Sequence, residues 1–378
     1  MFRLSPALLA VLLVVAPANA TTPDPETWRV QYPGLVLFDP GPRAADLQRL
    51  DEAERRRLCP PPGIEGEPPP VVRLVGPATA SGADPAAQPF TLMAMSGAAA
   101  ALAGDIYTGK MAVLTIARWA KADALSDLVE VGPDRNNANT IYSLRRVLLG
   151  LIPAWAVLRT RTPPEPALGA TVEAWLQRRV SDADQPTGPA SGRATEVTPG
   201  NRNHQRLMRE AVVMAHGALT GAADKFRRGG QAFLGALREM RPDGSLPLET
   251  ARGARALWYQ RHAVASLVFI AELARAQGYD LYGADLEGRK LARGVDFLLT
   301  EISEPRRLAS YAPERQDLAF LDTRPSGRNL MAWLEAWHRR SPPGALATGD
   351  LVPTQLARRP LIDEISGGNL TCFFAKIG

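Results

Sequence analysis

The sequence has few of the residues that build disulfide scaffolds or metal centres. It contains two cysteines, Cys59 and Cys372, and four histidines in 378 residues. The histidines show no close spacing with carboxylates or thiols of the kind that ligates a metal. We therefore expect no metal and no cofactor. An even cysteine count in an oxidising compartment favours a disulfide between Cys59 and Cys372, although two separate thiols remain the alternative.

Long hydrophobic runs are also missing beyond the first twenty residues, which have the features of an export signal. Arg3 is followed by an apolar run at 8–15, and Ala18-Asn19-Ala20 forms a small-x-small cleavage site. The run is shorter than the ~20 residues that span a bilayer. We expect residues 1–20 to be removed, no membrane insertion afterwards, and a periplasmic or secreted protein.

The charge balance is mildly basic, with a formal net charge of +5. In the periplasm this excess favours an anionic polysaccharide as partner over nucleic acid. The alternative is a basic surface with no specific partner. Apolar residues make up 46% of the chain, which is enough for a sizeable core. We expect a monomer.

The spacing of apolar residues predicts an all-α protein. Residues 21–89 are rich in proline and glycine and are expected to be irregular, whereas residues 90–378 form the catalytic domain. Helices are expected near 98–103, 110–128, 139–157, 171–180, 205–219, 222–240, 250–277 and 286–302. So many helical hairpins indicate an incomplete (α/α) toroid or barrel. The connection 181–201 is expected to be a loop, either a mobile lid or an ordinary insertion.

Two short segments carry most of the chemistry in this sequence. Asn203-His204 follows the long loop, and Arg252, Arg255, Tyr259 and His262 are spaced so that one helix beginning near residue 250 would place them on one face. The alternative is a capping histidine, arginines that are either solvated or paired with Glu249, and a core tyrosine.

This set of side chains suits β-elimination on a polymer of uronic acids. The reaction must neutralise a sugar carboxylate, remove the neighbouring C5 proton and protonate the leaving oxygen. An arginine can hold a carboxylate with two hydrogen bonds, and guanidinium groups beside a tyrosine stabilise its phenolate. A histidine is the commonest general base.

The same segments resemble the poly(β-D-mannuronate) alginate lyases, polysaccharide lyase family 5. The resemblance rests on motifs in a shared order: the helix-forming stretch 117–125, the Asn-His pair at 203–204, Gly-Ser-Leu-Pro at 244–247, Arg-Gly-Ala-Arg-Ala-Leu-Trp-Tyr at 252–259, Gln-Asp at 316–317, Ala-Trp-Leu-Glu at 332–335 and Gly-Gly-Asn-Leu-Thr at 367–371. It covers residues 90–374.

The resemblance implies an (α/α) toroid and metal-free catalysis. Asn203 and Arg252 would neutralise the substrate carboxylate, and His204 would assist as base or carboxylate partner. Tyr259 would protonate the O4 leaving group and could also remove the C5 proton, because both lie on one side of the β-D-mannuronate ring. Substrate-binding roles are expected for three further residues, namely Arg255, Arg202 and His262.

Two other functions compete with a polyuronate lyase. A non-catalytic protein could hold acidic polysaccharide during export, although a pure binder has no need of the Tyr259 phenol. A glycoside hydrolase on an α/α barrel would need two opposed carboxylates about 5–10 Å apart. Asp243, Glu249 and Glu335 are conceivable candidates, but no pair stands out in the sequence.

Overall fold

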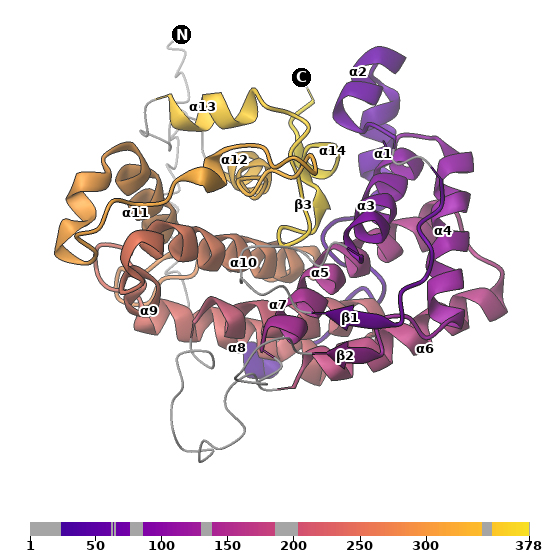
Figure 1. The fold of residues 1–378 in the computed structure, drawn as a ribbon, viewed down its shortest axis with the longest axis horizontal. Helices are drawn as coiled ribbons and strands as arrows, with labels where there is room; N and C mark the ends of the chain where they lie inside the picture. Colours follow the sequence, from indigo (N-terminus) through magenta and orange to yellow (C-terminus); the bar gives the residue numbers. More distant parts are fainter. Residues whose placement is uncertain are drawn as a thin grey trace, which may run out of the picture.

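The computed structural model describes residues 24–61, 63, 66–75, 86–129, 138–185, 203–341 and 350–377. The expected signal peptide at 1–20, Arg202 and residues 186–201 of the expected loop lie outside this part of the chain. Figure 1 shows the fold, in which helices surround a central group formed by α5, α7 and α10.

Helical hairpins form the body of the protein, as expected from the apolar spacing. In chain order the helices of the body are α3 (Gln88–Leu102), α4 (Ile106–Lys121), α5 (Ala138–Arg161), α6 (Pro166–Ala183), α7 (His204–Thr220), α8 (Ala223–Glu239), α10 (Ala256–Ala276) and α11 (Leu291–Ser303). Helix α3 packs on α5, α5 on α7, and α7 on α10 to make an inner layer. Helices α4, α6, α8 and α11 contact this layer from outside. The two layers confirm the (α/α) toroid.

Burial explains which helices are inner ones. Helix α10 buries every residue from Ala256 to Ala274 except Tyr259, so this helix is enclosed on almost all sides. Helix α5 includes Asn139–Arg161, a stretch long and apolar enough to cross a membrane, contrary to the expectation that none follows the signal. Its apolar window is fully buried in the fold, which is the pattern of a core helix.

The N-terminal segment, expected to be irregular, contains two short α-helices. These are α1 (Pro40–Gln48) and α2 (Glu52–Leu58), preceded by the 3-10 helix η1 (Pro25–Thr27). The side chains of Asp39 and Asp51 accept hydrogen bonds from the first turns of α1 and α2, so both helices have an N-cap. Strand β1 (Arg73–Val75) then pairs in parallel with β2 (Asp127–Val129).

The C-terminal part is built from short elements, of which α12, α13, α14 and β3 are labelled in the upper half of Figure 1. They are η4 (Pro305–Ser310), η5 (Ala319–Leu321), α12 (Leu334–Arg340), α13 (Leu351–Leu356), the antiparallel pair β3 (Ile362–Asp363) and β4 (Gly368–Asn369), and α14 (Leu370–Phe374).

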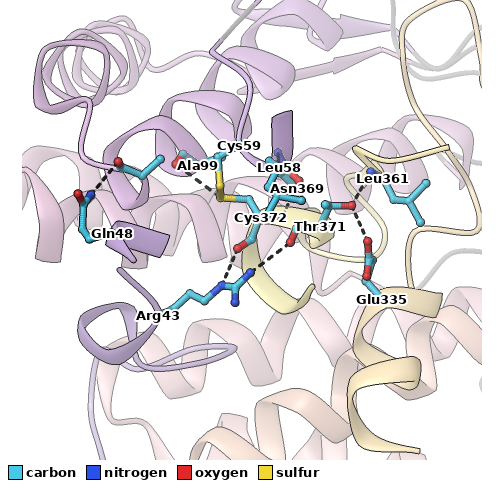
Figure 2. The surroundings of a disulfide bond; sticks show 11 residues. Arg43, Gln48, Leu58, Cys59, Ala99, Glu335, Leu361, Asn369, Thr371 and Cys372 are labelled. Atoms are coloured by element: carbon cyan, nitrogen blue, oxygen red, sulfur yellow. Dashed lines mark hydrogen bonds between the residues drawn. A yellow bond between two sulfur atoms is a disulfide. The ribbon is translucent and has the colours of Figure 1, made fainter. Parts of the chain in front are cut away.

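A disulfide joins the two ends of the described chain (Figure 2), which confirms the favoured pairing of Cys59 with Cys372. Hydrogen bonds reinforce the same junction. Arg43 donates to the carbonyl oxygens of Cys372 (2.8 Å) and Thr371 (3.4 Å), and Asn369 donates to that of Leu58 (3.3 Å). The N-terminal helices are therefore fixed to the C-terminal hairpin and α14.

The expectation of one continuous helix from residue 250 is wrong. The chain forms α9 (Pro247–Thr250) and the 3-10 turn η3 (Gly253–Arg255) before α10 begins at Ala256. The interruption has a local cause, since Gly253 adopts a φ of +55°, in the left-handed region that favours glycine. Arg252 and Arg255 therefore precede the helix instead of lying along its face.

Candidate active site

The Asn203-His204 pair opens α7, and the loop into α10 lies against it. Asn203 is the N-cap of α7, and its side-chain oxygen accepts a hydrogen bond from the backbone N–H of Gln205 (3.0 Å). That bond fixes the carboxamide, because its oxygen is committed to the helix start. The amide nitrogen is the group that can donate to a ligand.

Glu249, at the end of α9, holds His204 with both carboxylate oxygens. One oxygen accepts the backbone N–H of His204 (2.6 Å), and the other lies 3.0 Å from its Nδ1. Both side chains are 2% exposed. A carboxylate can only accept, so Nδ1 carries a proton. The Nε2 atom then accepts a proton when His204 is neutral and donates a hydrogen bond when it is charged.

Tyr259 and Arg252 complete the cluster around His204. The Tyr259 ring stacks on the His204 ring with a centroid separation of 4.7 Å and an interplanar angle of 28°. Arg252 is exposed, and its guanidinium carbon lies 4.4 Å from the centroid of the Tyr259 ring. The break before α10 therefore does not separate these residues, because the arginine side chain reaches back over the tyrosine.

The remaining expected site residues lie at different depths. Arg255 is partly exposed, with its Nε 3.9 Å from a carboxylate oxygen of Asp317, so part of its charge is balanced within the protein. His262 is 1% exposed, and its ring lies 4.7 Å from that of His204. His262 therefore contacts His204 and does not line an open surface.

The three carboxylates considered for hydrolysis are all engaged within the fold. Glu249 binds His204, while Glu335 pairs with Arg359 and accepts a hydrogen bond from Thr371 (2.7 Å). Asp243 accepts hydrogen bonds from Tyr311 (2.6 Å) and Ser245 (2.7 Å). These bonds keep the pKa of Asp243 below its usual value against the opposing effect of burial, which is the largest single influence. None of these three carboxylates is free of partners, and a hydrolase needs a pair that is available to the substrate.

The geometry agrees with the comparisons with known proteins. The alginate lyase family model matches residues 75–308. The chain belongs to the alginate lyase family. Its sequence relatives include a polysaccharide lyase of Stenotrophomonas maltophilia, 29% identical over 71% of this chain and 72% of that protein. An alginate lyase of Pseudomonas syringae pv. tomato is 30% identical over 58% of this chain and 54% of that protein.

Solved alginate lyases share the fold of this family member. Alginate lyase A1-III from Sphingomonas species A1 has a TM-score of 0.73 at 23% identity, covering 93% of this chain and 99% of that chain. A tyrosine-to-phenylalanine variant of A1-III, complexed with a tetrasaccharide, has a TM-score of 0.75 at 23% identity, with 93% and 98% coverage. These matches confirm the helical toroid.

Glu249 is the site residue that sequence reasoning assigned differently. From the sequence, Glu249 was considered either as a partner of the arginines or as the acid of a hydrolase. It lies 45 residues from His204 along the chain, and only the folded turn at α9 brings the two together. The one signal in the sequence was the position of Glu249 three residues before Arg252 in the family-like segment, and that position does not identify His204 as its partner.

Proposed function

We propose that this member of the alginate lyase family cleaves 1,4-linked uronic-acid polymers by β-elimination and leaves 4,5-unsaturated ends. The preferred substrate is mannuronate-rich alginate or a related polyuronate. The observation that carries the proposal is the cluster of Arg252, Tyr259 and His204 around one point, with the Asn203 amide at the same helix start.

The first task of the site is to neutralise the substrate carboxylate. The C5 proton becomes acidic only when the negative charge that develops on that carboxylate is stabilised. Arg252 is exposed and can form two parallel hydrogen bonds to the carboxylate. We expect the Asn203 amide nitrogen to donate to it as well, and His204 Nε2 to do so when that ring is charged. These donors are fixed before substrate binds, by the N-cap bond of Asn203 and the Glu249 contact of His204.

The second task is the transfer of one proton. The Tyr259 phenolate oxygen removes the C5 proton, and the released electron pair forms the C4–C5 double bond. The C4–O4 bond breaks, and O4 takes the proton from the phenol, which regenerates the phenolate. A single tyrosine can do both because the C5 hydrogen and O4 of β-D-mannuronate lie on the same side of the ring. Tyr259 is the one partly exposed residue in the buried run of α10, so its hydroxyl can meet a ligand.

The site favours elimination over the two competing functions. A hydrolase would need two available carboxylates, but Asp243, Glu249 and Glu335 are bound to other groups in the fold. A polysaccharide-binding protein would need the arginine and the amide but not a phenol stacked on a held histidine. We also propose that the protein acts in the periplasm or after secretion, on the basis of the signal sequence at 1–20.

The proposal is tested by ultraviolet absorbance, which rises when an unsaturated uronate end forms. Purified mature protein is offered polymannuronate, polyguluronate and polyglucuronate, and the polymer with the fastest rise identifies the substrate. Tyr259→Phe should abolish the rise. Tyr279→Phe is the matched control, because the Tyr279 hydroxyl binds the backbone of Arg29 away from the site. Flat traces with all three polymers would exclude lyase activity on them.

A further inference from the structure

The His204 ring contacts two other rings. Tyr259 lies on one face at 4.7 Å and 28°, and His262 lies beside the ring at 4.7 Å and 30°. Glu249 binds the edge that carries Nδ1. The imidazole therefore has two ring contacts and a hydrogen bond at Nδ1, while its other nitrogen, Nε2, lies on a different edge of the ring.

His262 occupies an unusual position for a polar residue. It is 1% exposed, and the ring of Tyr142 on α5 meets it edge-on at 5.8 Å. Its Nε2 is buried without a hydrogen-bond partner among the described residues. A buried nitrogen without a hydrogen bond is destabilising, and an aromatic hydrocarbon ring at the same place would avoid that cost. The position therefore needs an explanation other than stability.

A buried cluster of charged groups lies near His262. Arg146 is paired with Glu364, and Arg328 is paired with both Glu364 and Asp363 (3.0 Å to the latter). The titratable and charged groups around His262 are His204 from α7, Tyr142 and Arg146 from α5, Arg261 from α10, and Arg328 from the loop before α12. Asp363 of β3 and Glu364 directly after it pair with Arg146 and Arg328.

These surroundings keep His262 uncharged. Burial is the largest cause that holds the pKa of His262 well below its usual value, and electrostatic interactions with His204, Arg261, Arg146 and Arg328 lower it further. A neutral imidazole puts a flat, polarisable surface against His204 without adding a positive charge beside it. The His262 ring is itself restrained, because it is 1% exposed and contacts the rings of both Tyr142 and His204.

We propose that His262 is a positioning residue that fixes the plane of the His204 ring, so that its Nε2 edge points at the substrate carboxylate. This inference rests on the proposed lyase function. It assigns to His262 a role through His204 in place of the direct substrate contact expected from the sequence. A displacement of about 1 Å in a catalytic group can reduce the rate ~10²-fold, so a loss of this support should be measurable.

The test compares three substitutions at one position. His262→Phe retains a flat ring, His262→Leu fills much of the space without one, and His262→Ala removes both. We expect the Leu and Ala variants to lose roughly 10–100-fold in kcat with KM nearly unchanged, and the Phe variant to recover most of the activity. Rates are divided by the concentration of folded protein.

His216 provides the matched control. It is also 1% exposed and also has a buried Nε2 without a partner among the described residues, but it lies twelve residues further along α7 than His204. His216→Leu should lower the thermal midpoint without changing kcat per folded molecule. Equal kcat for wild type and His262→Leu would overturn the proposal. So would a Phe variant as impaired as the Leu variant, because the imidazole nitrogens and not the ring plane would then be responsible.

A crystal structure of His262→Leu separates this inference from the proposed function. We expect the His204 ring to be turned from its wild-type plane while Glu249 still contacts Nδ1. An unchanged His204 ring would contradict the positioning role even if the protein proved inactive on every polymer tested. Conversely, a turned ring in a protein that gives flat absorbance traces would retain the positioning role and reject the lyase activity.

Discussion

Substitution of Glu249 by glutamine tests how the site holds His204. In the wild type one oxygen of Glu249 accepts the His204 backbone N–H at 2.6 Å, and the other lies 3.0 Å from Nδ1. Glutamine has a single acceptor. If its oxygen remains on the backbone N–H, its NH2 group faces Nδ1 and moves the imidazole proton to Nε2. If the glutamine amide is turned the other way, its NH2 group faces the backbone N–H of His204, and two donors then lie against each other.

The expected size of the effect follows from these two contacts. A hydrogen bond to a charged group contributes about 1.5–3 kcal/mol, and both partners here are nearly fully buried. If the lost bond is one that orients His204 for the reaction, kcat should fall by roughly 10–100-fold. The loss of charge on Glu249 adds to this, because a charged His204 would no longer face a carboxylate. KM should change less than kcat.

The assay is the initial rate of absorbance increase on the best polymer, normalised to folded protein. Glu272→Gln is the matched control, since Glu272 is equally buried on α10 but binds Tyr282 (2.7 Å) and Arg340 (2.9 and 2.7 Å) away from the site. It should lower stability and leave kcat unchanged. If Glu249→Gln retains the wild-type kcat while losing as much stability as Glu272→Gln, the Glu249 contact is structural only and the reasoning is refuted.

Three further predictions follow from the same structure. Arg252→Gln should reduce kcat/KM about 10²–10³-fold, because the substrate carboxylate loses its stabilising guanidinium. Arg255→Gln should reduce kcat/KM less, because the Arg255 guanidinium lies 3.9 Å from the Asp317 carboxylate and its charge is partly balanced there. Equal losses of kcat/KM in the two variants would contradict this. Replacing both disulfide cysteines by serine should lower the free energy of unfolding by about 2–5 kcal/mol in urea titrations, and an unchanged midpoint would be inconsistent with the junction in Figure 2. Burial, with a smaller effect of Lys225, lowers the pKa of His216 to about 4, so below pH 6.5 the unfolded chain binds a proton that the folded chain does not. The free energy of unfolding should therefore fall by up to about 3 kcal/mol between pH 6.5 and 4, and it should fall less in the His216→Gln variant.

The helical body of the protein could be predicted because its apolar spacing is strong. Helices α7 and α8 begin and end within a residue or two of the expected positions. The break between Thr250 and Ala256 could not, because it depends on the left-handed conformation of Gly253. The N-terminal helices were hidden by the proline and glycine content around them, although the aspartate N-caps of α1 and α2 are local signals that could have located them.

The site was predictable as a set of residues but not as an arrangement. Arg252 and Tyr259 are close in sequence, so their contact follows from either a helix or a turn. The pairing of Glu249 with His204 joins residues 45 positions apart. The ring contact of His204 with His262 also needs α7 and α10 to pack side by side. Contacts of this kind depend on tertiary packing, which a single sequence does not reveal.

The most direct test of the central claim is the mass of the oligosaccharides released from polymannuronate by the wild-type protein. Elimination adds no water, so we expect each new non-reducing end to be lighter by one water than a saturated end, and we expect no such products from Tyr259→Phe. Products with saturated ends would show hydrolysis and contradict the elimination mechanism.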